Sequence, residues 1–150
     1  MQLTRAADYA VRVMIHLAGL PSGTRASRAE LAGAAECPEQ FLSKVLQNLT
    51  RAGLVISHRG NTGGFELPDN HNTATMLEIV EAIEGPLRLN LCLVSEGACP
   101  RRTGCPAHCV WAEAQEAMAA VLRKASIGDL ARRFSAMRET TPEPETSRWN

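Results

Sequence analysis

The order of the elements predicted in the first 68 residues is the feature that most constrains the fold. Apolar residues recur at helical spacing over residues 4–19, which predicts an amphipathic helix. Ser27 followed by Glu30 is a capping-box pair, and this pair opens a short second helix over residues 28–35. The chain therefore begins with two helices.

A third helix and a hairpin follow. Pro38 fits the first turn of this helix, and Gly53 is its expected stop. Two short apolar runs, residues 54–56 and 65–67, enclose a polar turn rich in glycine, which predicts a β-hairpin. This order of elements is that of a winged helix-turn-helix. The sequence therefore predicts a mainly α fold in which residues 1–68 form a winged helix-turn-helix with a small β-hairpin wing.

The remaining residues divide into further parts. Thr75 and Glu78 are a second capping-box pair, and they open a helix that ends before Gly85. The expected parts are a connecting helix within residues 69–89, a cysteine loop over residues 90–109, dimerisation helices over residues 107–137, and a disordered tail, rich in Pro, Glu and Thr, over residues 138–150.

The second helix of the helix-turn-helix has the pattern of a DNA-reading helix. Its predicted buried stripe is Phe41, Leu42, Val45, Leu46 and Leu49. The opposite face carries Gln40, Ser43, Lys44, Gln47 and Arg51. These side chains suit base edges in the major groove and phosphates. The pattern alone fits a solvated helix face equally well, and the adjoining hairpin favours DNA.

The hairpin tip adds His58 and Arg59 to the candidate DNA-binding residues. A narrow wing with one arginine suits the minor groove, where the negative potential attracts a guanidinium. Residues 1–65 contain seven Lys and Arg against four Asp and Glu, although the whole chain has a formal net charge of zero. The expected partner is double-stranded DNA.

Four of the five cysteines lie in one segment, CLVSEGACPRRTGCPAHCV, with the spacing C-x6-C-x5-C-x3-C. Its glycines and prolines predict an irregular loop, on which thiols can converge to bind a metal or an iron–sulfur cluster. An odd cysteine count argues against a secreted disulfide framework. With no signal peptide and no apolar run long enough to span a membrane, we expect a cytoplasmic protein without a membrane partner.

These residues together resemble the IscR/NsrR-type regulators of the Rrf family. The resemblance covers about residues 1–135 and rests on MQLTRAADYAVRVMIHLA, FLSKVLQNLTRAGLV, RGNTGGFEL and the cysteine loop ahead of a long helix. It implies a dimeric winged-helix transcription factor with an iron–sulfur cluster that responds to cluster supply, iron, nitric oxide or redox state. By position, the implied thiolate ligands are Cys92, Cys99 and Cys105, and the implied DNA-reading residues are Gln40, Ser43, Lys44 and Arg59.

The resemblance leaves the fourth ligand open. CPAHCVW resembles the IscR-like arrangement, in which His108 would complete a [2Fe–2S] site. The amino-terminal segment resembles NsrR-like proteins, in which Asp8 of the partner subunit would complete a [4Fe–4S] site, and this alternative is slightly favoured. Cys109 is a third, weaker candidate. Cys37 lies outside the loop and is expected to be a small buried hydrophobe.

The long helix predicts a homodimer. Its apolar stripe comprises Val110, Trp111, Ala114, Ala117, Met118, Val121, Leu122 and Ala125. The stripe either packs on its own chain or forms a two-fold interface, and we favour the interface.

Three classes of function are thus considered. The leading one is a DNA-binding repressor that senses redox, nitric oxide or iron status through a cluster. The second is a winged-helix regulator with a zinc or thiol/disulfide switch at the loop. An enzyme is not expected, because the sequence lacks a Gly-rich phosphate loop after a strand and any Ser/His/Asp arrangement tied to a motif.

Overall fold

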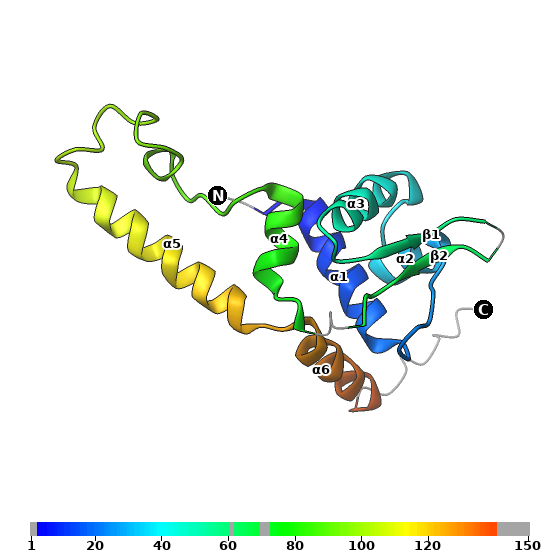
Figure 1. Cartoon of the computed structure of the whole chain (residues 1–150). Coiled ribbons are helices and arrows are strands. Elements are labelled where there is room, and N and C mark those ends of the chain that lie inside the picture. Colours follow the sequence, from blue (N-terminus) through cyan, green and yellow to red (C-terminus); the bar gives the residue numbers. More distant parts are fainter. Residues whose placement is uncertain (1–2, 61, 70–72, 141–150) are drawn as a thin grey trace, which may run out of the picture.

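The computed structural model of the chain describes residues 3–60, 62–69 and 73–140. The elements, in chain order, are α1 (Arg5–Gly19), α2 (Arg28–Ala35), α3 (Glu39–Arg51), β1 (Ile56–His58), β2 (Gly64–Glu66), α4 (Met76–Glu84), the 3₁₀ turn η2 (Leu91–Leu93), α5 (Pro106–Lys124) and α6 (Ile127–Thr140). Figure 1 shows a body around α1, from which α5 extends to one side. The fold is the predicted mainly α winged helix-turn-helix with a long additional helix.

Local hydrogen bonds explain where the helices begin. The Ser27 hydroxyl accepts from the Glu30 N–H, and the Glu30 carboxylate accepts from the Ser27 N–H, so the predicted capping box is present. Thr75 and Glu78 form the same reciprocal pair at the start of α4. Pro38 is the N-cap of α3 and stands just before its first turn.

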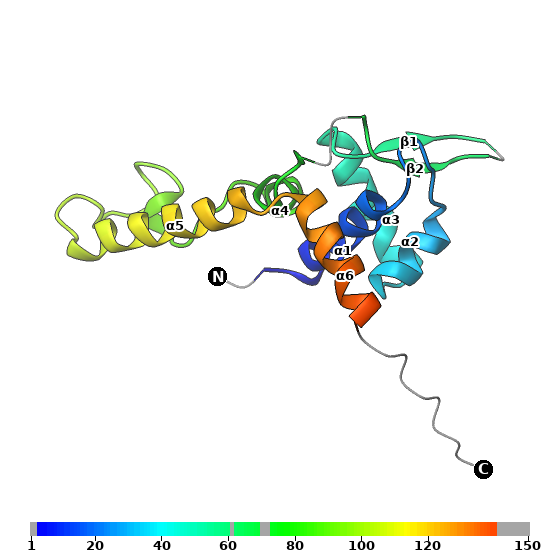
Figure 2. The same cartoon turned by 90° about the horizontal axis from the view of Figure 1, so that it is seen from below.

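The core surrounds α1, which packs against α2, α3, α4 and α6 (Figure 2). Met14 of α1, Leu31 of α2, Leu49 of α3 and Ile127 of α6 are fully buried. Leu42, Val45 and Leu46 are buried as predicted, but the prediction for Phe41 is wrong, because its side chain is 70% exposed. Phe41 lies at the edge of the α3 stripe, where helical periodicity does not tell which flank another element covers.

The hairpin pairs β1 with β2 in an antiparallel register that places Ile56 opposite Glu66 and His58 opposite Gly64. A backbone bridge between Ala26 and Phe65 joins the hairpin to the segment before α2. β1 starts two residues later than its apolar run suggested, because residues 54 and 55 are buried in the core and close the turn after α3. β2 starts one residue earlier than its apolar run, at Gly64.

A backbone junction returns the chain to the body after α5. The Met76 N–H donates to the Ala125 carbonyl and the Ile127 N–H donates to the Ala74 carbonyl, both at 2.8 Å. From this junction α6 packs along α1, and it continues to Thr140, beyond its expected end at residue 137. The rest of the predicted tail, residues 141–150, lies outside the described residues.

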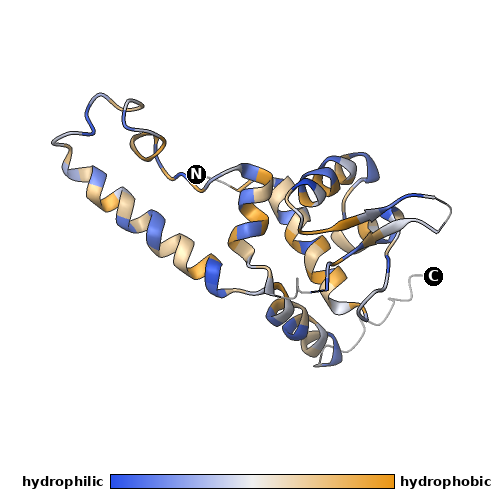
Figure 3. Cartoon of the chain, in the orientation of Figure 1, coloured by the Kyte–Doolittle hydropathy of each residue, from blue (hydrophilic) through white to orange (hydrophobic). Residues whose placement is uncertain are grey.

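One side of α5 packs on its own chain. Ala119 forms a small apolar cluster with Leu77 of α4 and Leu87, and Met118 and Leu122 pack against this cluster. Most of α5 stands away from the body, and both apolar and polar residues occur along its length (Figure 3). No helix among the described residues is long and apolar enough to cross a membrane.

Candidate nucleic-acid interface and cysteine loop

The outer face of α3 presents the predicted DNA-reading side chains together. Gln40, Lys44, Gln47 and Arg51 are exposed, and Ser43 is half-buried at the edge of this face. The buried Leu and Val residues on the opposite side hold the helix on the body. The arrangement can therefore present amides, an ammonium and a guanidinium to a duplex.

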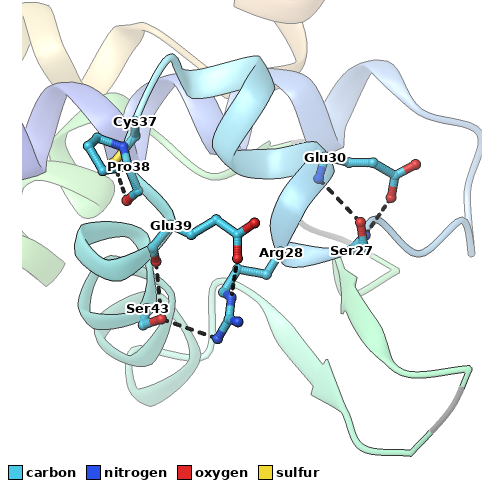
Figure 4. A network of polar contacts seen from close by, with 7 residues as sticks. All are labelled: Ser27, Arg28, Glu30, Cys37, Pro38, Glu39 and Ser43. Carbon is cyan, nitrogen blue, oxygen red and sulfur yellow. Dashed lines mark hydrogen bonds and ion pairs between the residues drawn. The ribbon is translucent and has the colours of Figure 1, made fainter.

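Ser43 belongs to a polar network that the sequence did not reveal (Figure 4). Its hydroxyl donates to the Glu39 carbonyl at 3.2 Å and accepts from Arg28 Nη1 at 3.4 Å. Arg28 Nε also donates to Glu39 Oε2 at 3.2 Å. Arg28 is the first residue of α2, so the network joins the two helices of the helix-turn-helix at their outer edge.

The wing places its two candidate residues differently. Arg59 follows β1 at the hairpin tip and is exposed, as a minor-groove contact requires. His58 instead points to the neighbouring strand, where its Nε2 lies 2.7 Å from Glu66 Oε1. His58 can therefore reach DNA only through the rest of its ring, and its role there stays a prediction.

Arg25 completes a clamp on the hairpin. Its Nε donates to Glu66 Oε2 and its Nη1 donates to the Thr62 carbonyl, both at 3.4 Å. The hydrogen bond from His58, assisted by Arg25, lowers the pKa of Glu66 below its usual range. A Cβ on Gly63 would lie 2.5 Å from the His58 carbonyl oxygen, so only glycine fits this close approach.

The cysteine loop lies between α4 and α5, at the end of α5 away from the winged-helix body (Figure 1). Cys92 is buried in η2, Cys99 and Cys105 are half-buried, and Cys109 is exposed in the first turn of α5. All five cysteines are free thiols. Among the residues that the structure describes, no three His, Cys, Asp or Glu side chains are close enough to hold a metal ion. The loop thus contains the thiols but does not bring three possible ligands together among the described residues.

The candidates for a fourth ligand have different surroundings. His108 Nδ1 is buried and makes no hydrogen bond to any described residue. Asp8 lies on α1, where Arg12 Nη2 pairs with its carboxylate at 3.0 Å, and its side chain is 57% exposed. Arg12 Nη1 also pairs with Glu36 at 3.1 Å, and Asp8 is the main cause that raises the pKa of Arg12 above its usual value.

Cys37 is buried between α2 and α3, which confirms the prediction of a small buried hydrophobe. Its Sγ lies 3.4 Å from the Pro38 carbonyl oxygen. Burial raises the pKa of this thiol above its usual value, so it stays protonated.

Comparisons with known proteins agree with this architecture. A family model described as Rrf2, iron-dependent transcriptional regulator, matches residues 3–133. The chain is 36% identical over 132 residues to Protein aau3 of Rhizobium meliloti, covering 87% of this chain and 84% of that protein. It is 35% identical over 132 residues to the HTH-type transcriptional regulator Rv1287 of Mycobacterium tuberculosis, covering 87% and 81%.

Solved structures show the same fold. CymR, the global cysteine regulator of B. subtilis, superposes with a TM-score of 0.70 at 26% identity, covering 89% of this chain and 98% of that chain. IscR of T. potens superposes with a TM-score of 0.72 at 21% identity, covering 96% and 94%. The resemblance to this family that the sequence indicated is confirmed. The members of the family are DNA-binding transcriptional regulators and not enzymes. The chain belongs to the Rrf2 family of transcriptional regulators.

Proposed function

We propose that this chain is a dimeric, DNA-binding repressor that senses redox, nitric oxide or iron status through an iron–sulfur cluster on its cysteine loop. The observation that carries the proposal is the loop itself. Four free thiols and His108, with its unpartnered Nδ1, lie within one short segment that ends in the first turn of α5. Such a concentration of soft ligands in a DNA-binding protein suits a sensor.

The residues present suit an iron–sulfur cluster. Cys92, Cys99 and Cys105 would hold it as thiolates, the ligand type that such clusters require. The loop consists of single turns and η2, whose few local hydrogen bonds allow the thiols to be drawn together. When bound, a cluster supplies a chromophore that is sensitive to oxidants, nitric oxide and iron supply.

Two residues compete for the fourth position. The amino-terminal resemblance favours Asp8 of the partner subunit, with [4Fe–4S] as the expected cluster. The Asp8–Arg12 pair is exposed, and exposed pairs contribute little, so releasing this carboxylate costs little. The unpartnered Nδ1 favours His108, with [2Fe–2S] as the expected cluster. Cys109 remains the third candidate.

The side of α5 that its own chain leaves exposed supports the proposed dimer. Val110, Trp111 and Val121 are 65%, 42% and 68% exposed. With the exposed Ala114 and Ala117 they form one stripe, which we call the outer α5 face. Met118 and Leu122, from the same predicted stripe, pack inward instead. A second copy of this helix is the occupant that would cover the outer α5 face, as in a two-fold interface.

Anaerobic purification tests the proposal. Protein with a cluster is coloured and contains iron and sulfide, and its affinity for operator DNA changes when the cluster is removed. Colourless protein without sulfide, purified with iron and cysteine supplied, would contradict the cluster. The experiment also reports whether the repressor form is the one with or without the cluster.

The second candidate is a zinc or thiol/disulfide switch at the same loop. Cys105 and Cys109 have the only close chelating spacing in the loop, and Cys109 is exposed. A solved relative of the same fold, CymR of Staphylococcus aureus, is described in an oxidised form. Zinc content, or a mass loss of two hydrogens after peroxide, would favour this switch.

A further inference from the structure

A groove runs between the recognition helix and the wing. Its volume is about 450 Å³. The polar residues that line it are Arg28, Ser43, Gln47, Thr50, Arg51 and Ser57, and Leu46 and Phe65 form its apolar floor. None of these described lining residues carries a carboxylate, so the groove offers two guanidinium groups and uncharged hydrogen-bonding groups to a ligand.

Two observations indicate that the groove contains polar groups available to bind a ligand. Thr50 Oγ1 is buried in its wall and makes no hydrogen bond to any described residue. Arg28 uses Nε and Nη1 within the protein, whereas its Nη2 makes no hydrogen bond to the described part of the chain. Its side chain is 54% exposed.

The position of Arg28 identifies the ligand. In helix-turn-helix proteins the first helix crosses the DNA backbone while the second lies in the major groove. Arg28 begins the first helix, and the groove it borders separates the DNA-reading face of α3 from the hairpin. A strand that passes from α3 to the wing must cross this groove.

We propose that Arg28 binds a backbone phosphate of double-stranded DNA through Nη2, and that Glu39 and Ser43 hold its guanidinium in position. Glu39 has a second effect. Its carboxylate shares the guanidinium with the phosphate and repels the phosphate, so it limits the affinity of the site for DNA of any sequence. The contact carries no base information, and it fixes the orientation of α3 on the duplex.

Fluorescence anisotropy with a labelled mixed-sequence duplex tests the proposal on the full chain, over about 50–200 mM salt. Arg28→Gln removes the charge and leaves a shorter side chain that still carries a polar amide. It should weaken binding roughly three- to tenfold and make the slope of log K against log salt less steep by about 0.9, the value for one phosphate. Arg28→Lys should retain the slope. Arg123→Gln, an equal charge change on α5, is the matched control and should retain both affinity and slope.

Glu39→Gln distinguishes a phosphate contact of Arg28 from a purely structural role of the Arg28–Glu39 pair. The proposal expects tighter binding, by roughly two- to fivefold, because the competing carboxylate is gone. If the Arg28–Glu39 pair only holds α2 and α3 together, removing either residue should weaken DNA binding and leave the salt slope unchanged. An unchanged slope for Arg28→Gln overturns the proposal, whatever its affinity. The proposal needs DNA binding but no cluster, so apoprotein that passes these tests supports it even if the cluster assignment fails.

Discussion

His58 and Glu66 are diagonal neighbours on the two strands of the hairpin, with His58 Nε2 2.7 Å from Glu66 Oε1. The hydrogen bond lowers the pKa of Glu66, so the folded protein binds this proton less readily than the unfolded chain. Glu66 therefore contributes stability that is present above its unfolded pKa of about 4.3 and is lost as the pH falls through the lower folded pKa. The wing is thus stabilised at neutral pH and weakened by acid.

Glu66→Gln should remove this pH dependence. The difference in thermal midpoint between wild type and this variant is expected to be constant above about pH 5 and to shrink as the pH falls below about 4. Differential scanning calorimetry across this pH range measures the difference in thermal midpoint. Glu139→Gln, an exposed position on α6, serves as control and should show no such trend. A difference that grows towards acid pH would contradict the clamp.

Arg59→Ala should weaken operator binding by about 1–3 kcal/mol, because the exposed tip guanidinium is the group suited to the minor groove. Gel-shift titration at constant salt measures the loss. The effect should be larger for the operator than for an unrelated duplex. Wild-type affinity in this variant would remove the wing tip from the interface.

Val121→Glu should separate the dimer, because it places an unpaired charge on the outer α5 face, at a side chain that is 68% exposed in the single chain. Light scattering should then report the mass of one chain, 16.2 kDa, in place of twice that value. Arg123→Glu adds a carboxylate to the same helix outside this face and should remain dimeric. If the Val121 variant stays dimeric with an unchanged helical content, the subunits associate through another surface.

Cys92→Ala, Cys99→Ala and Cys105→Ala should each give colourless or unstable protein after anaerobic purification, because each removes one of three obligatory thiolates. Cys37→Ala is the matched control, since this thiol is buried in the body and stays protonated, and it should keep its colour. Iron and sulfide analysis accompanies the absorption spectrum. Full metal content in all three loop variants would contradict the cluster-sensing function.

His108→Ala and Asp8→Ala should alter the spectrum and the cluster lifetime without abolishing colour, since the fourth ligand is more easily replaced than a thiolate. A [4Fe–4S] spectrum changed only by Asp8→Ala would identify the partner subunit's Asp8 as ligand. A [2Fe–2S] spectrum changed only by His108→Ala would identify His108. Resonance Raman spectroscopy on the two variants distinguishes the cases.

The helices were predictable because their signals are local. The Ser27–Glu30 capping box and the stop at Gly53 depend on residues within one turn, so the sequence alone contains them. Phe41 shows the limit of this reasoning. Periodicity identifies the apolar stripe of a helix, but it does not tell which edge of that stripe another element covers. The strands shifted for a similar reason, because an apolar run marks burial and not pairing.

The site was predictable only as a set of residue types. The spacing of the cysteines places them on one loop, but bringing them together depends on packing, metal or a second subunit, none of which spacing encodes. Arg28 escaped notice because its partner Glu39 is 11 residues away on another helix. Only the helix-turn-helix geometry puts the two side chains side by side.

The paired backbone bonds at residues 74–76 and 125–127 have an evolutionary consequence. Because these two short segments are bonded to each other, α4, the cysteine loop and α5 are enclosed between them, and the register of α6 on α1 does not depend on the length of the loop between α4 and α5. Lengthening such a loop costs little free energy, about 0.6 kcal/mol per doubling. Loops of other lengths and compositions can therefore be exchanged on an unchanged winged-helix body.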